Sequence, residues 1–427
     1  MTGDLSSLPG ALAGTRVLLA HPSGEMYGSD RMLLETVSGL VDARAEVTLA
    51  LAADGPLATE ARDRGATVVV CESPVLRKSM LSVRGMARLI ATTVRGVRAG
   101  RRLLRTVRPD VVLVNTLTIP LWTVLPRFAG LGRARPRVIC HVHEAEGKAS
   151  RVIGWMLVTP LRFADGVLAN SRYSIDVLRR SSAKVADRAV LIDNGVAGPA
   201  QPHRARTAID GPVRLLYIGR LSERKGVDLA VEAVRLLRAR GCEATLEIAG
   251  AVFPGYEWFE ASLREQIRRD NLQDAVRLHG FSDDVWSLIE RADIVVVPSR
   301  FDEPFGNTAV EAILGGRPVI VSDTSGLREA AEGYASARFV PAGDAGAIAD
   351  ATTYLIDRWP GVRERAWADR ARAEARHSPA AYRRRIATSV RSMVRGRGLT
   401  DNDRTDVPPT GTRPDLGADS GTERRLV

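Results

Sequence analysis

One stretch of the chain, residues 292–312, decides the fold, and it reads ADIVVVPSRFDEPFGNTAVEA. Its first part is a run of apolar, mostly β-branched residues up to Val297, which is typical of a strand buried on both faces of a parallel sheet. Pro298 cannot continue that strand, so a loop follows. The spacing after the loop predicts a helix that begins near Asn307 or Thr308, because both residue types are common N-caps. A strand, a loop and a helix in this order are the repeating unit of an α/β fold.

The loop between this strand and this helix carries groups that can hold a phosphate and a sugar. The backbone amides of Phe305, Gly306 and Asn307 would lie at the N-terminus of the helix, where free N–H groups and the helix dipole attract anions. Gly306 would let the backbone approach a ligand closely. Glu303 before the helix and Glu311 inside it could face the same bound molecule, and carboxylates are strong acceptors for its hydroxyl groups.

The same alternation of strands and helices continues through most of the 427 residues. It occurs twice, on either side of a linker rich in proline and glycine at residues 198–212, so we expect two doubly wound halves. Ligands of such sheets bind beyond the carboxyl ends of the strands, which predicts a site between the halves. Strands are expected at residues 16–21, 46–51, 67–71, 111–115, 138–142, 166–169 and 190–192, and then at 213–218, 244–249, 275–279, 293–297, 318–321 and 338–340.

Several segments resemble glycosyltransferase family 4. Glu303 and Glu311 have the Glu-x7-Glu spacing typical of that family, and residues 315–320, GGRPVI, are similar to the strand that follows it. Residues 218–228, IGRLSERKGVD, resemble the family's Gly-Arg-Leu segment with its later Lys-Gly. Two glutamates at this spacing alone would more often mark a solvated helix face, so the surrounding pattern carries the likeness. The resemblance extends over about residues 16–395, which is essentially everything but the tail.

The resemblance implies an α/β protein with the GT-B fold, in which two Rossmann-like domains face each other across a cleft. It implies transfer of a sugar, with retention of configuration, from a UDP- or GDP-linked donor, without a cofactor or an obligatory metal ion. Arg220 and Lys225 would bind the donor diphosphate together with the amides near Gly306, since two cations beside a helix N-terminus can neutralise a leaving diphosphate. Glu311 would bind the ribose, and Glu303 the sugar hydroxyls.

Two further contacts to the donor follow from the resemblance alone. The main chain at Phe281 and Ser282, after a predicted strand, occupies the position where the family holds the nucleotide base. The first loop of the chain, residues 21–31, does not match the dinucleotide-binding Gly-x-Gly-x-x-Gly pattern. Its Gly28 instead resembles the glycine turn with which the family approaches the donor phosphate and the acceptor.

Two histidines, His141 and His143, lie at the end of another predicted strand and are followed by Glu144. A metal site is one interpretation of this group. We expect the two histidine side chains to point to opposite faces of the strand, which argues against a shared metal ion. Family 4 enzymes have one histidine at this strand end, which approaches the donor sugar or the acceptor hydroxyl. His143 aligns best with it and is the second predicted catalytic residue beside Glu303, and His141 is the alternative; for each, a structural histidine remains open.

Composition and charge narrow the classes of protein further. A hydrophobic fraction of 45% and a charged fraction of 26% are those of a globular protein. Its three cysteines, Cys71, Cys140 and Cys242, are too far apart in sequence to form a CxxC motif. No secretory signal is visible, and the longest apolar run, residues 152–161, is shorter than the roughly 20 residues that span a bilayer. We expect a cytoplasmic protein.

The net charge of +11 is concentrated in residues 77–108, which contain no acidic residue and predict one or two basic amphipathic helices. Such a helix could lie on an anionic membrane at the inner face of the cell membrane, or it could simply be a solvated face. We expect no nucleic-acid partner. The domains predicted are an acceptor-side domain at 1–198, a nucleotide-sugar domain at 199–378, a helix returning to the first domain at 379–395, and a disordered tail at 396–427.

The function expected from these observations is transfer of a sugar to a glycan, a lipid-linked or a small-molecule acceptor in envelope or exopolysaccharide synthesis. Two alternatives stay open. One is a GT-B enzyme without an acceptor, such as a nucleotide-sugar epimerase or hydrolase. The other is a membrane- or nucleic-acid-binding protein built on the basic segment.

Overall fold

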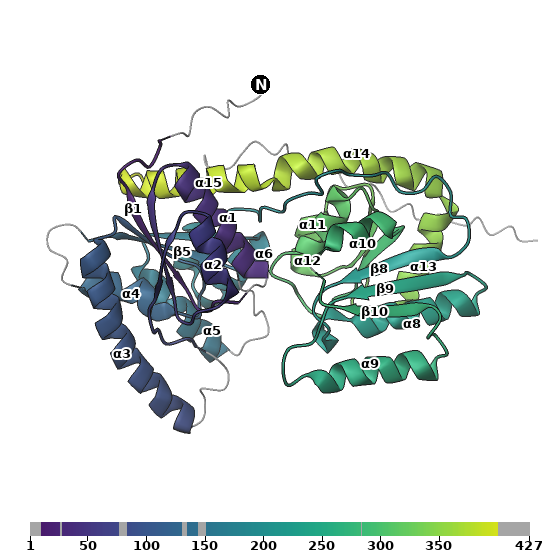
Figure 1. Cartoon of the computed structure of the whole chain (residues 1–427), viewed down its shortest axis with the longest axis horizontal. Coiled ribbons are helices and arrows are strands. Elements are labelled where there is room, and N and C mark those ends of the chain that lie inside the picture. Colours follow the sequence, from purple (N-terminus) through teal and green to yellow (C-terminus); the bar gives the residue numbers. More distant parts are fainter. Residues whose placement is uncertain are drawn as a thin grey trace, which may run out of the picture.

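The computed structural model describes residues 10–25, 28–76, 83–129, 135–143, 151–282 and 284–399. These residues form two parallel sheets, one in each half of the chain. Figure 1 shows the two halves side by side, with helices on both faces of each sheet. Strands covered on both faces must be apolar nearly throughout, which explains their valine- and isoleucine-rich sequences.

The first sheet has seven strands within the described residues, in the order β3-β2-β1-β4-β5-β6-β7. The order reverses between β1 and β4, so a crevice forms at the carboxyl ends of these two strands. The strands are β1 (Arg16–His21), β2 (Glu46–Leu51), β3 (Thr67–Val70), β4 (Val111–Val114), β5 (Arg137–Val142), β6 (Gly166–Ala169) and β7 (Ala189–Leu191).

Two separate apolar clusters fill the faces of this sheet. One face packs against α1 (Gly28–Asp42) and α2 (Pro56–Asp63). The other packs against a row of helices, which are α3 (Val83–Val107), α4 (Pro120–Phe128), α5 (Arg151–Val158), the 3-10 helix η3 (Thr159–Phe163), α6 (Arg172–Ser181) and α7 (Ala183–Ala186). Thus α3 is one helix where one or two were expected, and residues 77–82 of the basic segment lie outside the described residues.

The second sheet has six strands within the described residues, in the order β10-β9-β8-β11-β12-β13. Its strands are β8 (Val213–Ile218), β9 (Ala244–Ala249), β10 (Val276–Gly280), β11 (Ile294–Val297), β12 (Val319–Ser322) and β13 (Ala337–Val340). Around it lie η4 (Glu223–Lys225), α8 (Val227–Ala239), α9 (Glu257–Arg269), α10 (Val285–Arg291), α11 (Asn307–Leu314), α12 (Ser325–Ala331) and α13 (Ala345–Asp357). The reversal between β8 and β11 repeats that of the first sheet.

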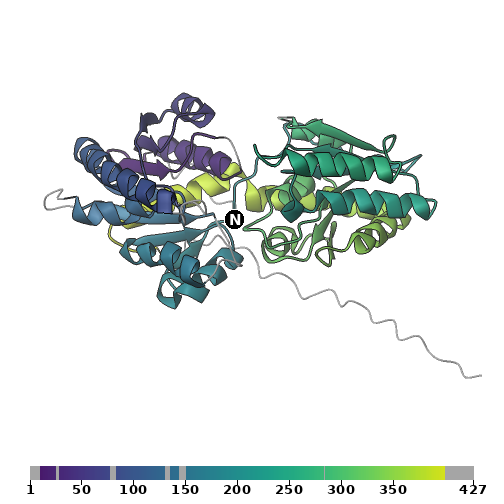
Figure 2. The same ribbon diagram turned by 90° about the horizontal axis from the view of Figure 1, so that it is seen from below.

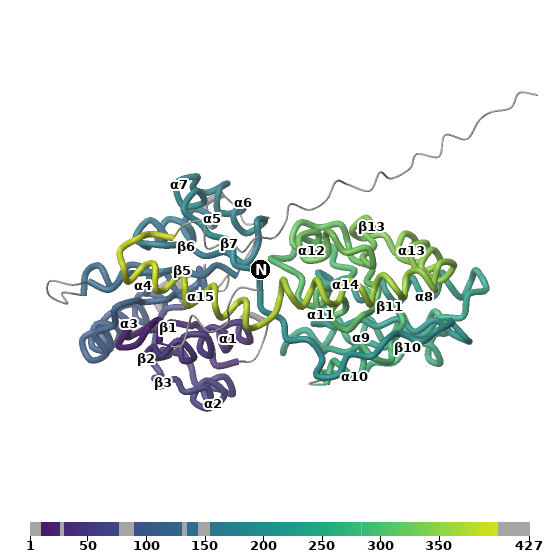
Figure 3. Tube along the Cα trace, turned by 90° about the horizontal axis from the view of Figure 1, so that it is seen from above, coloured from purple at the N-terminus to yellow at the C-terminus, as the bar shows by residue number. Residues whose placement is uncertain are grey.

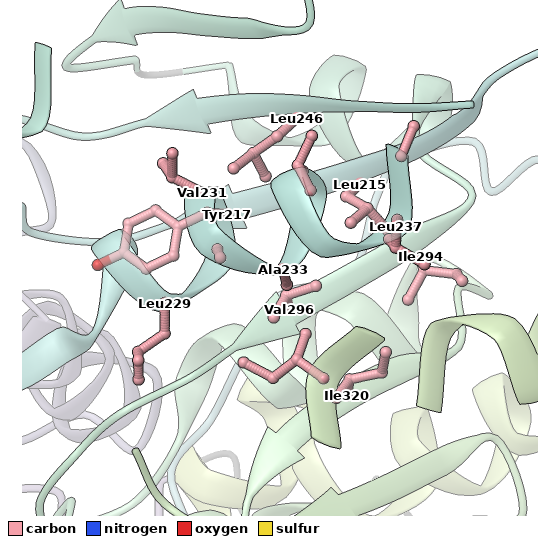
Figure 4. Packing of buried hydrophobic residues seen from close by; sticks show 14 of the residues in the cluster. Leu215, Tyr217, Leu229, Val231, Ala233, Leu237, Leu246, Ile294, Val296 and Ile320 are labelled. Atoms are coloured by element: carbon pink, nitrogen blue, oxygen red, sulfur yellow. The ribbon is translucent and has the colours of Figure 1, made fainter. Parts of the chain in front are cut away.

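One of the two apolar clusters of the second half lies between this sheet and α8. Figure 4 shows Leu237 of α8 packed beside Leu215 of β8 and Ile294 of β11. Tyr217 belongs to the same cluster, and its hydroxyl donates a hydrogen bond to the carbonyl oxygen of Arg220 at 2.8 Å. The core thereby fixes the start of the loop that follows β8.

The last two helices connect the halves. Figure 3 shows α14 (Trp359–His377) running along the second half and α15 (Pro379–Val394) continuing over the first; Figure 2 gives the same arrangement from below. Tyr382 and Ile386 of α15 are buried in the cluster that also contains α1. A Cβ placed on Gly39 of α1 would lie 2.8 Å from the Cβ of Arg383, so α1 and α15 are in direct backbone contact.

The strands agree closely with the sequence-based expectation. Each predicted strand is present, with its ends within one residue of the predicted ones. Helix α11, predicted within residues 292–312, begins at Asn307, but its N-cap is Gly306 instead of Asn307 or Thr308. The tail lies outside the described residues from position 400 onward. None of the helices in the described ranges combines the length and the apolarity needed to cross a bilayer.

Candidate active site

Glu303 lies in the loop after β11 and is held by two neighbours. Its side chain is 7% exposed. One carboxylate oxygen accepts a hydrogen bond from the Ser299 hydroxyl at 2.9 Å, and the other lies 3.0 Å from the Lys225 ammonium. The structure therefore brings together two residues that were predicted to contact the same donor, Glu303 its sugar and Lys225 its diphosphate.

Two glycines make this close approach possible. Gly226 has φ 67°, and a Cβ there would lie 2.1 Å from the carbonyl oxygen of Pro298. At Gly326, a Cβ would lie 2.0 Å from the carbonyl oxygen of Glu303. The loop after β11 therefore lies against the backbone of Gly226, just before α8, and of Gly326, in the first turn of α12, and a side chain on either glycine would push it away.

Arg220, the second predicted diphosphate ligand, follows β8 and is exposed. Its guanidinium lies over the ring of Phe253, with Cζ 3.5 Å from the ring centroid. This cation–π contact restrains the side chain beside the carboxyl end of β8.

The amides of residues 305–307, predicted to bind phosphate, lie at the N-terminus of α11, where Gly306 is the N-cap and Asn307 the first helical residue. The side chain of Phe305 is buried, with its ring 5.8 Å from that of His377. A Cβ on Gly306 would lie 2.7 Å from Leu327 of α12. The Asn307 side chain accepts a hydrogen bond at 2.9 Å from Asn194, which lies shortly after β7. Phe305 and Asn307 thus both contact protein through their side chains at this end of α11.

Glu311 lies inside α11 and is partly exposed. Desolvation by the surrounding protein raises the pKa of its carboxyl group, and the positive charge of Arg31 in the first half counteracts this. Glu311 therefore lies within electrostatic reach of α1 across the gap between the halves. A ligand whose hydroxyl groups donate hydrogen bonds to this carboxylate would offset the cost of its desolvation.

The remaining predicted donor contacts are divided between the two halves of the chain. Phe281 follows β10 at the end of the sheet and is 65% exposed, and Ser282 is partly exposed beside it. Gly28 is the first residue of α1 in the other half.

The expected orientation of the His141 and His143 side chains is wrong. Their rings do not point to opposite faces, because residues two apart on a strand share a face; the ring centroids are 4.0 Å apart. Both rings are deeply buried, and burial lowers the pKa of His143 to about 3 and that of His141 well below its ordinary value. Among the described residues no group of three His, Cys, Asp or Glu could hold a metal ion.

A row of polar residues beside His143 was not predicted. His143 Nε2 is 3.1 Å from Asn115 Oδ1, and Asn115 Nδ2 is 3.3 Å from His21 Nδ1. His21 Nε2 is 2.7 Å from Asp30 Oδ1. The signal was present in the sequence, because His21, Asn115 and His143 each end or directly follow a buried strand.

The two halves also meet at α6 and α12. The Glu329 carboxylate of α12 accepts hydrogen bonds from the backbone amides of Arg172 and Tyr173 at 2.7 and 2.6 Å, at the N-terminus of α6. A cavity of about 570 Å³ lies beside this contact, and residues of both halves line it, including Arg180 and Phe301.

Comparison with known proteins agrees with this geometry. Residues 26–197 match the family model described as Glycosyltransferase Family 4, and residues 200–374 match the model described as Glycosyl transferases group 1. Glycogen synthase from Mycobacterium tuberculosis is 32% identical over 296 residues, which cover 65% of this chain and 68% of that protein. The amylovoran biosynthesis glycosyltransferase AmsK from Erwinia amylovora is 34% identical over 153 residues, 34% of this chain and 36% of that protein.

Among solved structures, Anabaena HepE in complex with UDP and glucose superposes with a TM-score of 0.72 at 21% identity, covering 88% of this chain and 100% of that chain. This likeness shows the GT-B fold. The paired sheets, the converging loops and both family models lead to one conclusion: the chain belongs to glycosyltransferase family 4 and is a glycosyltransferase of the hexosyltransferase type.

Proposed function

We propose that this enzyme transfers a sugar from a nucleotide-diphosphate sugar, most simply a UDP-sugar, to a glycan or lipid-linked acceptor, with retention of configuration. One observation carries the proposal: Glu303, Lys225 and the N-terminus of α11 converge at one edge of the second sheet. The complexes of HepE with UDP and with UDP-glucose support the choice of nucleotide. The relatives that make glycogen and amylovoran support a glycan acceptor.

The donor would be held from its phosphates to its sugar. Arg220, Lys225 and the amides at residues 305–307 would bind the diphosphate, Glu311 the ribose, and the main chain at Phe281 the base. In the structure Lys225 is paired with Glu303. Binding of a diphosphate would draw the ammonium toward the phosphates, and the sugar hydroxyls would then donate hydrogen bonds to the Glu303 carboxylate.

In the transfer itself, the bond from the anomeric carbon to the phosphate oxygen breaks, and a bond to the acceptor oxygen forms on the same face. The proton of the acceptor hydroxyl passes to the leaving phosphate. The cations that bind the diphosphate lower the energy of this step because negative charge grows on the leaving oxygen.

A thermal-shift series tests the donor assignment. UDP should raise the melting temperature of the wild type, while Arg220→Ala should abolish the shift. Arg264→Ala on α9 is the matched control, since Arg264 is also exposed but pairs with Glu260 outside the site; it should keep the full response. If GDP alone shifts the melting temperature, the donor nucleotide is GDP instead of UDP. If neither nucleotide shifts the melting temperature of the folded wild type, the proposal is contradicted.

The same preparation separates transfer from the alternatives. Incubation with UDP-glucose and no acceptor should release little glucose and no epimer, because a transferase retains its donor until an acceptor arrives. Rapid release of sugar into water, or of an epimerised nucleotide-sugar, would instead identify a hydrolase or an epimerase.

We further propose that α3 contacts an anionic membrane. On its outer surface, arginines surround one cavity of about 530 Å³, namely Arg98, Arg101, Arg102 and Arg105. Ile90 and Val94 of the same helix are exposed by 61% and 45%. A basic face with exposed aliphatic side chains matches the headgroups and upper acyl chains of anionic lipid.

Co-sedimentation with vesicles tests this contact. The wild type should bind phosphatidylglycerol vesicles and should leave pure phosphatidylcholine vesicles unbound. The double substitution Arg101→Glu and Arg105→Glu should release the protein, while UDP binding stays unchanged. Equal binding of the wild type to both vesicle types, or none to either, would contradict a role for charge.

A further inference from the structure

The loop that joins β9 to α9 lies beside the segment that would bind the donor diphosphate. A Cβ on Gly250 would lie 1.8 Å from the carbonyl oxygen of Gly219. The backbone amide of Leu221 donates a hydrogen bond to the carbonyl oxygen of Ala251 at 3.0 Å. Gly219 and Leu221 flank Arg220, so these backbone contacts hold the start of the loop in a fixed position next to that residue.

This loop and the first turn of α9 are rich in aromatic residues. Residues 253–259 read FPGYEWF, so four of these seven residues are aromatic, against 5% of the whole chain. One of the four, Phe259, is buried in the apolar cluster that contains α8. Tyr256 and Trp258 are exposed by 54% and 60%, although an exposed ring forgoes the stabilisation that burial provides. Core packing therefore explains Phe259 and leaves the two exposed rings without a structural reason.

The aromatic rings are held in place by one another and by the loop. Phe253, next to the donor site, lies under the Arg220 guanidinium, and its carbonyl oxygen accepts a hydrogen bond from the amide of Tyr256 at 2.9 Å. The ring centroids of Tyr256 and Trp258 are 6.5 Å apart, and Trp258 stands perpendicular to Phe259 at 5.7 Å. Contact with a core residue restrains Trp258 while most of its ring faces solvent. Phe253, Tyr256 and Trp258 are called the aromatic row below.

The chemistry of the aromatic row fits a glycan chain. A sugar ring has a face of C–H bonds that packs on an aromatic ring, and its hydroxyl groups donate hydrogen bonds to carboxylates. Glu257 and Glu260, in the first turn of α9, supply two carboxylates. Gly255 and Arg264 already donate to them, but a carboxylate can accept about four hydrogen bonds.

The same features disfavour a lipid surface at this place. The negative charges of Glu257 and Glu260 oppose binding to anionic headgroups. Figure 1 also shows α9 on the second half of the molecule and α3, the basic helix proposed to contact the membrane, on the first. The aromatic row is therefore a separate surface that adjoins the proposed donor site.

We propose that the aromatic row binds a neutral glycan chain and holds its body while the end of the chain reaches the cleft. That this chain is the acceptor rests on the proposed function, whereas its binding to the aromatic row does not. Among the acceptor classes of the proposed function, the row selects a glycan of several sugars, because a small molecule in the cleft would not extend to Tyr256 and Trp258.

Native electrophoresis through gels that contain a neutral glucan tests this binding in the full-length protein. The probes are glycogen, dextran and a mixed-linkage β-glucan, and retardation against glucan concentration gives a dissociation constant. At least one probe should retard the wild type. Trp258→Ala should weaken that binding about twofold to tenfold, the range that one contact between rings contributes, and Trp258→Phe should retain most of it. The proposal is overturned if no probe retards the wild type, or if Trp258→Ala binds as the wild type does.

The matched control is Trp155→Ala on α5, because Trp155 is a tryptophan exposed by 54% in the first half. This variant should bind the glucan as the wild type does, and an equal loss in both variants would overturn the assignment to the aromatic row. Both side chains are mostly exposed, so both variants should keep the melting temperature of the wild type. If Trp258→Ala nevertheless fails to fold, Tyr256→Ala carries the same prediction.

Calorimetry with UDP separates this proposal from the proposed function. Trp258→Ala should bind UDP as the wild type does, because Arg220 and Lys225 are unchanged. A wild type that binds glucan but not UDP would show that the proposed donor is wrong while the aromatic row stands. A wild type that binds UDP but none of the glucans would show that the aromatic row alone is wrong.

Two other occupants of the aromatic row are outcomes of further measurements on the same proteins. If the wild type is a dimer in sedimentation velocity and Trp258→Ala is a monomer, the row joins two copies of the chain and the proposal is overturned. If Trp258→Ala loses binding to phosphatidylglycerol vesicles, the row contacts lipid and the proposal is overturned as well. We expect neither change.

Discussion

Replacing Gly226 by alanine should destabilise the enzyme much more than the same replacement at Gly241. Both glycines have positive φ, 67° and 80°, so alanine is strained at each by about 1–2 kcal/mol. They differ in their surroundings. A Cβ at Gly226 would lie 2.1 Å from the carbonyl oxygen of Pro298, whereas a Cβ at Gly241 would meet no heavy atom within 4 Å.

The steric part of the effect can be bounded from overpacked cores. Forcing extra atoms into a packed site costs about 1–3 kcal/mol. The total for Gly226→Ala is then about 2–5 kcal/mol in the free energy of unfolding, against about 1–2 kcal/mol for Gly241→Ala. Relief of the clash must move Pro298, and with it the loop that carries Glu303, so binding of UDP-glucose should weaken as well.

Urea unfolding and calorimetry with UDP-glucose measure the two effects. Gly241 follows the far end of α8, a helix of 13 residues that rises about 20 Å, so its substitution should leave binding unchanged. Equal destabilisation of the two variants would refute the reasoning, because it would mean that the Pro298 carbonyl yields at no cost. Normal binding by Gly226→Ala would show that Glu303 does not depend on this contact.

Three further predictions concern charge and proton binding. Lys225→Met should weaken UDP binding about tenfold or more and lower the free energy of unfolding by roughly 1–3 kcal/mol, because the buried Glu303 carboxylate loses the ammonium 3.0 Å away. Arg224→Met is the control and should have a smaller effect, since the Arg224 guanidinium is 3.8 Å from Glu303. Calorimetry measures UDP binding by the two variants, and urea unfolding measures their stability. Glu329→Gln should lower the free energy of unfolding by about 1 kcal/mol and widen the angle between the halves, since a carboxylate no longer binds two backbone amides. Small-angle X-ray scattering measures the change of shape, and an unchanged scattering profile would contradict the prediction. Burial lowers the pKa of His377 from 6.5 to about 3, so the unfolded chain binds the proton first as the pH falls. Stability that is present above pH 6.5 is therefore lost as the pH falls toward 3, and the loss at pH 5 is about 2 kcal/mol in the free energy of unfolding. His377→Leu should flatten the dependence of the melting temperature on pH.

The sequence predicted the strands well because burial on both faces leaves little freedom in composition. The run Ile294–Val297, for example, could hardly belong to a half-exposed strand or a surface helix. The strand ends were also well marked, since Pro298 cannot continue a ladder and the polar His21 ends another apolar run.

The arrangement of the site was only partly accessible from sequence. Motif spacing pointed to Glu303 and Lys225, but their direct ion pair depends on the contact between Gly226 and the loop after β11, two segments far apart in the chain. Asn115 was missed because a single asparagine after a strand has no motif around it. Its contacts with His21 and His143 become visible only when the sheet order places β4 between β1 and β5.

The place of α15 has a consequence for how the enzyme is made. Tyr382 and Ile386 complete the core of the first half, yet residues 192–378 must be synthesised between β7 and that helix. At ribosomal speeds of about 5–20 residues per second, this delay is on the order of 10–40 s. The face of the first sheet that α15 covers is therefore bare on the nascent chain while the whole second half emerges, and the first domain to be translated is the last to be finished.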